Sequence, residues 1–377
     1  MSVTITQHPS AISFAGNPVL LKAYSNLSGK TFLKVCAEVS VGIYQREAVV
    51  RDGIVYHLSI PSEGGSGKPV TFDFSDVLQS ALSQMAVERN AVLSGNDPSF
   101  TGGYVQYSVK VWDEFLNEYS EVTSTKDSGY VTSGRKVAIP GAYTDKQRLL
   151  LTEDTAAYLG SAHILSNKPD GEAVPLGGKV TVPVFSSSSR SVSVYANAVG
   201  SGNLLGTHPV YASEVSWRSF TPKAVGFQSL LWEGLELPPF FIHVVPEQPF
   251  SRYFEFVNRL GAVESIYTFG RAQRKNQLQQ ERQVKRHNVS FRPAARFIKR
   301  TLQEESLLEL TTGPLSREWA KWFAEEFFTA EQVWMYSKEA DDMVPVLIEA
   351  DEAISVFNES EAEVPDLPFK VTFCINV

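Results

Sequence analysis

The chain has 377 residues, a length that allows two or three domains, each with a core of its own. Its hydrophobic content of 43% and charged content of 20% are ordinary for a folded globular protein, and its net charge of −8 disfavours a general nucleic-acid binder. No apolar run approaches the ~18 residues of a membrane span, and the first residues lack the basic and apolar regions of a signal peptide. We therefore expect synthesis in the cytoplasm without membrane insertion.

Residues 1–135 are predicted to form an N-terminal β-sandwich-like domain. Over residues 104–112, polar and apolar residues alternate with the period of a half-buried antiparallel strand. One short helix is expected over residues 75–85, where Ser75 is a suitable N-cap. Many short strands with one helical insertion favour a sandwich.

Residues 136–270 are predicted to form a central β domain. Alternating valines flank the serine tract at residues 186–189 on both sides, so we expect two strands joined by a serine-rich turn in a hairpin. Residues 230–256 are dense in aromatic residues and prolines, which indicates packed β structure rather than disorder.

Residues 271–377 are predicted to form a C-terminal α+β module with a basic lead-in segment. The chain closes with five apolar residues in strict alternation, from residue 369 to residue 377, which predicts a strand paired in a sheet. The predicted fold class is therefore mainly β with a few short helices, in a multi-domain architecture of the β-sandwich type. An amphipathic helix is expected from four aromatic residues with the spacing of one helical face: Trp319, Trp322, Phe323 and Phe327.

The charge of the chain reverses within its last third. Residues 271–300 carry ten Lys or Arg against one Glu, whereas residues 301–377 carry seventeen Asp or Glu against four Lys or Arg. The basic block has three interpretations: a solvated linker between domains, a phosphate-binding strip, or a docking surface for an acidic partner. We favour a linker that also docks, since nucleic-acid strips commonly interleave aromatic residues or glycines. A simpler interpretation is that both blocks are merely solvated.

The docking interpretation predicts that basic residues of one subunit meet acidic residues of an adjacent subunit or of another protein. The basic interface candidates are Arg282, Lys285, Arg286, Arg292 and Arg296. The acidic interface candidates are Asp341 and Asp342, together with Glu304, Glu305, Asp351 and Glu352.

No pattern in the sequence indicates catalysis or cofactor binding. The motifs G-x-S-x-G, H-E-x-x-H and C-x-x-C and the dinucleotide fingerprint are all missing, and no two of the six histidines have the spacing of metal ligands. The two cysteines, Cys36 and Cys374, lie in apolar, strand-like runs, so buried reduced thiols are expected. We expect no catalytic residues, no cofactor and no metal, and hence no enzyme.

Three short motifs stand out along the chain. In residues 252–262, RYFEFVNRLGA, an aromatic strand leads into a turn that contains Asn258 and Gly261. Residues 312–316, TGPLS, precede the tryptophan-containing helix, and residues 9–18 form a distinctive opening phrase. In these motifs the chain resembles virion proteins of phages and prophages of Bacteroidetes, although Ala262 stands where that family has a second glycine.

The resemblance implies a structural component of a phage tail tip, a distal-tail or baseplate-like protein that assembles as a symmetric ring. The implied partners are further copies of this chain and other phage tail proteins, and the implied location is the virion tail. The alternative is a carbohydrate-binding adhesin of the phage tail that recognises a host-surface glycan through aromatic rings such as Trp112, Trp217 and Trp232. The strand-like context of these rings favours core packing instead. A polysaccharide-cleaving tail enzyme would need a matched acid/base pair, and no pattern singles one out.

Overall fold

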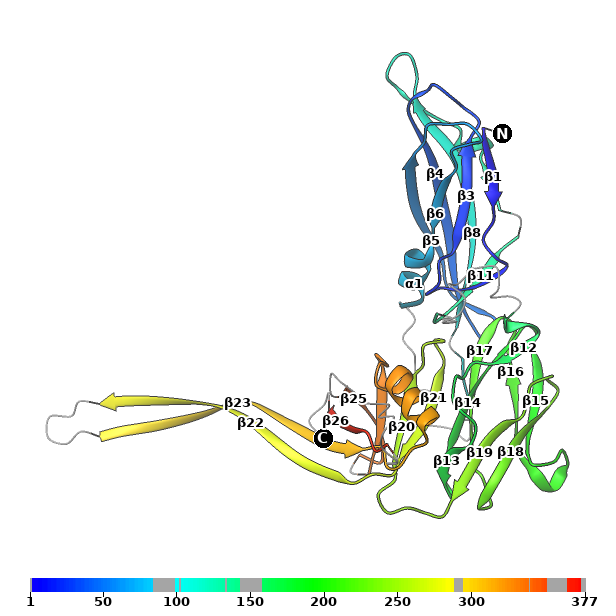
Figure 1. Ribbon diagram of the computed structural model, residues 1–377. Helices are drawn as coiled ribbons and strands as arrows, with labels where there is room; N and C mark the ends of the chain where they lie inside the picture. The colour runs from blue at the N-terminus through cyan, green and yellow to red at the C-terminus, as the bar shows by residue number, and fades with distance from the viewer. Residues whose placement is uncertain are drawn as a thin grey trace.

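The computed structural model describes residues 2–83, 99–101, 103–132, 134–142, 158–287, 294–338, 340–350 and 365–373. Five β-sheets and two short α-helices account for most of the described residues, which confirms the predicted mainly-β, multi-domain fold class. Figure 1 shows an N-terminal module that stands above a central and a C-terminal module, with one long hairpin projecting from the C-terminal module.

The N-terminal module packs a three-stranded sheet, β1-β3-β6, against a larger sheet, β2-β11-β8-β4-β5, in which β9 and β10 also pair with β8. The predicted alternation in β8 is confirmed, since Val105, Tyr107, Val109 and Val111 are all buried in the module's core. The elements are β1 (Val3–Gln7), β2 (Ile12–Phe14), β3 (Leu20–Ser25), β4 (Thr31–Gln45), β5 (Ala48–Pro61), β6 (Val70–Asp73), α1 (Ser75–Ser83), β8 (Tyr104–Leu116), β9 (Val122–Ser124), η2 (Lys126–Ser128), β10 (Tyr130–Val131) and β11 (Lys136–Ile139).

Cys36 lies inside this module on β4, as the sequence predicts for a buried thiol. Burial raises the pKa of its thiol to about 12, so the side chain stays protonated and unreactive at neutral pH. Cys374 lies outside the described residues.

The central module is a sandwich of the sheets β12-β14-β17-β7 and β13-β19-β18-β15-β16. The hairpin predicted around the serine tract is wrong, because β14 and β15 belong to different sheets and the turn carries the chain from one sheet to the other. The elements are β7 (Ser99–Thr101), β12 (Ala162–Ile164), β13 (Glu172–Pro175), β14 (Val180–Ser186), β15 (Arg190–Ala196), η4 (Ser201–Asn203), β16 (Leu204–Val210), β17 (Glu214–Phe220), β18 (Gly226–Glu233) and β19 (Phe240–Val245).

The C-terminal module is one seven-stranded sheet of order β21-β20-β24-β25-β26-β23-β22, with helical turns packed on one face. The sheet begins at β20, so the sequence-based division at residue 270 falls inside it. The elements are β20 (Arg252–Val257), β21 (Val263–Thr268), β22 (Ala272–His287), β23 (Ala294–Thr311), α3 (Arg317–Trp322), the π-helical turn η5 (Phe323–Phe327), β24 (Val333–Ser337), β25 (Asp342–Ala350) and β26 (Pro368–Phe373).

The aromatic face predicted over residues 319–327 is confirmed, but the helix that carries it changes from α3 to the π-helical turn η5 at Phe323. Ser316 caps α3 by accepting a hydrogen bond from the backbone N–H of Trp319, and Trp322, Phe323 and Phe327 are buried against the sheet. The closing alternation forms β26 as far as Phe373, held between β25 and β23 with Phe369 and Val371 facing the core, and its remainder at residues 374–377 lies outside the described residues.

The three modules share one hydrophobic cluster where they meet. Residues from all three modules pack together there, so their relative orientation is fixed by burial rather than by a flexible connection. The cluster contains Phe14, Tyr44, Tyr104, Ile139, Leu159, Leu165, Phe185, Val215, Trp217, Leu260, Ala262 and Val263.

The turn between β20 and β21 reaches into this junction. The side-chain oxygen of Asn258 accepts a hydrogen bond from the N–H of Ala262 at 2.9 Å, and its amide nitrogen donates to the carbonyl of Leu165 in the central module at 2.7 Å. Gly261 has a φ of +74°, and a Cβ there would lie 2.5 Å from the backbone of Pro140. Asn258 and Gly261 therefore hold three parts of the chain together.

We expect Gly261→Ala to destabilise the fold by roughly 2–4 kcal/mol, because it adds a backbone clash to an unfavourable φ. Gly29→Ala is the matched control, since Gly29 has a φ of +68° but no atom within 4 Å of a Cβ. Its expected cost is only about 1–2 kcal/mol. Chemical denaturation of both variants measures the difference, and equal losses would contradict the role given to the close contact.

Candidate functional site: a projecting basic arm and a buried polar joint

The hairpin β22–β23 carries most of the basic residues singled out by the sequence. Within the described residues, β23 pairs with β26 only over Leu307–Thr311, and the remainder of the hairpin continues as a two-stranded ribbon (Figure 1). We call residues 276–287 and 294–306 the arm. Because both strands belong to one sheet, the interpretation of the basic block as an interdomain linker is wrong.

The structure separates the predicted interface residues. The arm holds Arg282, Lys285 and Arg286 on β22 and Arg296 on β23, but it also holds the acidic candidates Glu304 and Glu305. The acidic candidates Asp341 and Asp342 lie at the turn between β24 and β25, in the body of the module. Three further candidates, Arg292, Asp351 and Glu352, lie outside the described residues.

Positive charge gathers in the distal half of the arm. Its residues 281–287 and 294–300 carry six Lys or Arg against one Glu. The register places Arg282 opposite Lys299 and Lys285 opposite Arg296. Like charges directly opposite in an antiparallel pair destabilise it. The register also places Glu281 opposite Arg300, so an anionic surface against the distal arm would offset only the two like-charge pairs.

The distal arm extends far beyond the edge of the sheet that holds its base. Arg300 and Arg296 precede Leu307, the first residue of β23 held by β26, by 7 and 11 residues. At ~3.4 Å per residue, these positions lie roughly 24 and 37 Å beyond the edge of the sheet. Among the described residues of the arm, the register places one acid beside these positions, Glu281 opposite Arg300.

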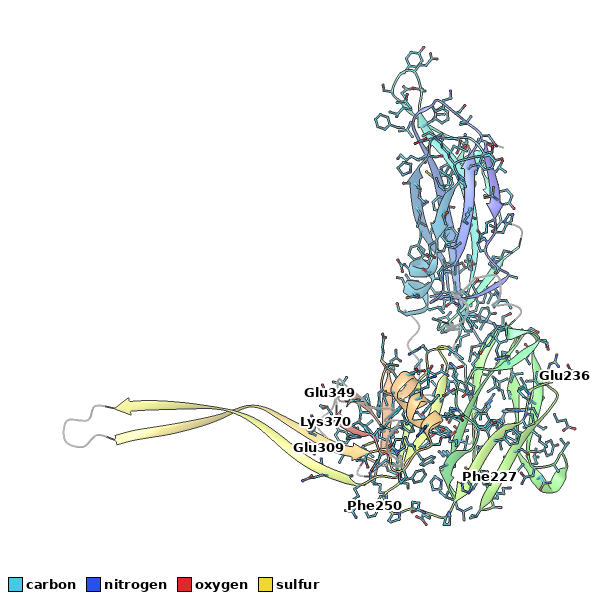
Figure 2. All side chains as sticks on the ribbon, in the orientation of Figure 1. Phe227, Glu236, Phe250, Glu309, Glu349 and Lys370 are labelled. Carbon is cyan, nitrogen blue, oxygen red and sulfur yellow. The ribbon has the colours of Figure 1, made fainter. Side chains whose placement is uncertain are left out.

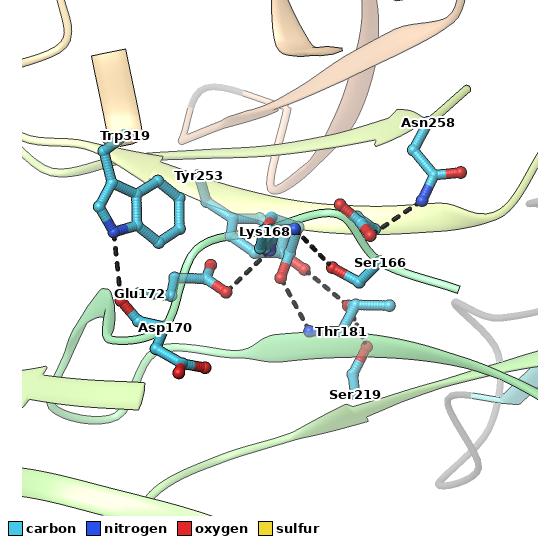
Figure 3. Close-up of polar contacts among 11 residues, drawn as sticks. Ser166, Lys168, Asp170, Glu172, Thr181, Ser219, Tyr253, Asn258 and Trp319 are labelled. Atoms are coloured by element: carbon cyan, nitrogen blue, oxygen red, sulfur yellow. Dashed lines mark hydrogen bonds and ion pairs between the residues drawn. The ribbon is translucent and has the colours of Figure 1, made fainter. Parts of the chain in front are cut away.

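A buried polar network joins the base of this sheet to the central module (Figure 3). Lys168, which follows β12, is only 1% exposed and forms an ion pair with the fully buried Glu172 on β13 at 2.8 Å. Its ammonium group also donates to the carbonyl oxygen of Ser265 on β21 and lies over the ring of Trp322 at 5.8 Å. One lysine thus connects the central sandwich to both the sheet and the helix of the C-terminal module.

Glu264, beside this lysine, is a second buried carboxyl group. It accepts a hydrogen bond from the side-chain amide of Asn258 at 2.8 Å and is 1% exposed. Burial raises the pKa of Glu264 to about 7, while Lys168 opposes that shift. Burial also raises the pKa of Glu172, again against the pull of Lys168. The joint therefore contains a carboxyl group that titrates near neutral pH.

Neutral hydrogen bonds complete the joint. The backbone N–H of Thr181 on β14 donates to the hydroxyl of Ser265 at 2.8 Å, and the backbone N–H of Lys179 donates to the hydroxyl of Tyr267 at 2.7 Å. Trp319 on α3 donates its indole N–H to the carbonyl of Asp170 at 3.4 Å. The base of the arm is thereby anchored to the central module through several elements.

The network holds modules together rather than presenting chemistry to a ligand. The side chains of Lys168 and Glu172 and the whole of Glu264 are at most 1% exposed, so no substrate can contact these charged groups in this conformation. Across the described ranges, no cluster of three or more His, Cys, Asp or Glu side chains has the arrangement of a metal site. No helix in the same ranges is long and apolar enough to cross a membrane.

Comparison with known proteins leaves the chain without an assigned family. No protein-family model and no curated protein matches it. Two solved structures are similar to it at 10% identity and a TM-score of 0.19. One is a marsupial T cell receptor, covering 82% of this chain and 96% of its own length, and the other is the BSP domain of a biofilm-associated protein, covering 82% and 62%.

The titration of Glu264 predicts a pH-dependent stability. In the folded state its pKa is about 7, above its ordinary value of 4.5. The folded chain therefore holds this proton more tightly than the unfolded chain. The stabilisation is complete below the unfolded pKa and is lost as pH rises toward and through about 7.

We expect Glu264→Gln, which is neutral at every pH, to gain in melting temperature relative to the natural chain between pH 5 and pH 8. Thermal melts across this range measure the difference. Glu349→Gln, which removes an exposed carboxylate on the same sheet, is the matched control. A Glu264→Gln difference that stays constant with pH would contradict the assignment.

Proposed function

We propose that this protein is a structural component of a phage tail tip, a distal-tail or baseplate-like protein that assembles into a symmetric ring. The observation that carries the proposal is the arm: a charged two-stranded ribbon that projects from a body in which three modules share a core. The virion location rests on the resemblance in the turn at Asn258–Gly261 and in the entry to the tryptophan-containing helix.

The arm supports an assembly role because it cannot stabilise itself. An isolated two-stranded hairpin is at best marginally stable in water, since it has no third strand and no packed face. The joint through Lys168 and Glu264 provides the arm with a fixed base. Such a combination is suited to a contact between molecules, in which the partner supplies the missing packing.

A reaching arm also favours a closed ring. When the arm of each copy contacts a different surface on the next copy, the interface is heterologous and is repeated around the assembly. Heterologous contacts produce rings when the rotation closes and filaments when it does not. A tail tip is built around an axis, so the proposal requires that the rotation between neighbouring copies closes into a ring.

Removal of the arm tests the proposal directly. Replacement of residues 276–306 by Asn-Gly joins Lys275 to Leu307, which are cross-strand partners, through a two-residue turn. We expect this variant to melt within a few degrees of the natural chain but to lose self-association by at least tenfold, because the sheet remains and the contact does not. Light scattering after size exclusion provides the measurement.

Fractionation of phage particles tests the location. The proposal requires the protein in purified tails, and its absence from tails would contradict the virion assignment. Self-association that is undiminished in the arm-deleted variant would contradict the role of the arm instead.

A carbohydrate-binding role is the second candidate, and the structure changes which residues it would use. Trp112 and Trp217 are buried at 4% and 2% exposure, so the expected core packing is confirmed and they cannot stack on a sugar. Phe227 on β18 is 77% exposed and stacks on His243 of β19 at 4.2 Å (Figure 2), which offers a flat ring to a pyranose face.

This candidate predicts glycan retention that depends on Phe227. A glycan array should show binding by the natural chain, and Phe227→Ala should lose it while its melting temperature is unchanged. Phe250→Ala removes a similarly exposed ring elsewhere and serves as the control. An array without hits would eliminate this role and leave the ring proposal standing.

A further inference from the structure

The C-terminal sheet has an outer face, opposite the helical turns, that is partly apolar and bordered by acids. Residues that alternate with the core positions of β24, β25, β26 and the base of β23 point to this side. The register gives three rows of neighbours across this side. Trp334 lies beside Pro345, Thr372 lies between Leu307 and Leu347, and Lys370 lies between Glu309 and Glu349. We call this surface the outer face.

The outer face exposes large apolar side chains in the folded subunit. Leu347 is 52% exposed and Tyr336 is 38% exposed, and they lie on the adjacent strands β25 and β24. A contiguous apolar surface with a polar border is typical of a protein contact.

Carboxylates border the apolar centre of the outer face. Glu309 and Glu349 lie on either side of Lys370 near the base of the arm (Figure 2). At the β24–β25 turn, Asp341 accepts a hydrogen bond from the hydroxyl of Tyr336 at 2.5 Å, so a third carboxylate is held over the same side. The chain from residue 307 to its end carries fifteen acidic residues against four basic ones, the most acidic part of the sequence.

We propose that the outer face of one copy is the seat for the distal arm of a second copy. The inference rests on the proposed ring assembly and names the two surfaces that form its contact. The arm brings six Lys or Arg against one Glu in residues 281–287 and 294–300, opposite in sign to the border of the outer face. The two surfaces lie on the same module, so every copy offers both and the contact repeats from copy to copy.

The arm and the outer face also show matching orders of charged and apolar residues. In the arm, the register pairs Arg282 with Lys299 and Val284 with Phe297, and Arg286 follows two residues after Val284, so residue types alternate in a basic–apolar–basic order at every second position. From the residue before β25 onward, the outer face is acidic at Asp341, apolar at Pro345 and Leu347, and acidic again at Glu349. Apolar burial would supply most of the affinity, whereas the charges would set register and association rate.

Pairing of a partner strand along the free edge of β22 is the less suitable mode. β22 is the outermost strand of its sheet, but it carries six charged residues in sixteen, and charged edge strands are a common device against edge-to-edge pairing. When the arm docks through side chains on a face, these charges can form favourable contacts with the acidic border of that face.

A charge exchange between two variants tests the contact. The arm variant carries Arg282→Glu, Lys285→Glu and Arg286→Glu, and the face variant carries Glu309→Lys, Asp341→Lys and Glu349→Lys. Each variant alone should associate at least tenfold more weakly than the natural chain at roughly physiological salt. An equimolar mixture should associate again, because each arm then meets a face of opposite charge. Melting curves establish that both variants are folded.

The control reverses three exposed lysines elsewhere, Lys30, Lys34 and Lys223, to Glu and should leave association unchanged. The proposal is overturned if the mixture of folded variants stays as weak as its components, or if the face variant alone associates like the natural chain. In either case, the proposed ring assembly through the arm would remain supported if the arm-deleted variant does not self-associate. A natural chain that remains monomeric but binds duplex DNA through the arm would overturn both proposals.

Discussion

A ribbon of two β-strands cannot bury a core, and this constraint governs the interpretation of the whole molecule. In a sheet, backbone pairing is supported by side chains packed on at least one face, and the arm has neither a third strand nor a covering element among the described residues. Two like-charge pairs within the register lower its stability further. An arm of this kind is consistent with a chain that completes its structure in contact with another molecule.

The remainder of the fold gives that arm a fixed direction. The shared hydrophobic cluster and the network around Lys168 hold the C-terminal sheet against the other modules. Buried ion pairs are weak sources of net stability because desolvation offsets their attraction, but each pair is satisfied in only one arrangement of its partners. We infer that this joint contributes more to the orientation of the modules than to their stability.

Local sequence patterns predicted those elements whose signal is carried by neighbouring residues. The alternation in β8 and the helical spacing at Trp319–Phe327 were readable because one face of each element is buried. The pairing partners of β14 and β15 could not be predicted, because partners within a sandwich lie far apart in sequence. Alternation shows that a segment is a strand but does not identify the strand beside it. The arm is rich in charged and polar residues and has no clear period, so it resembled a linker. Lys168, Glu172 and Glu264 were missed because single ionisable residues normally lie on surfaces, and their separation along the chain gave no sign that they meet.

Hydrogen exchange of the arm amides tests the central claim most directly, because it reports on the backbone of β22 and β23 before and after assembly. In the separated subunit, amides of residues 276–306 should exchange rapidly, while those of β26 remain protected. In the assembled form the arm amides should slow by at least tenfold, together with those of β24 and β25 under the outer face. Arm amides that exchange equally fast in both states would contradict the account.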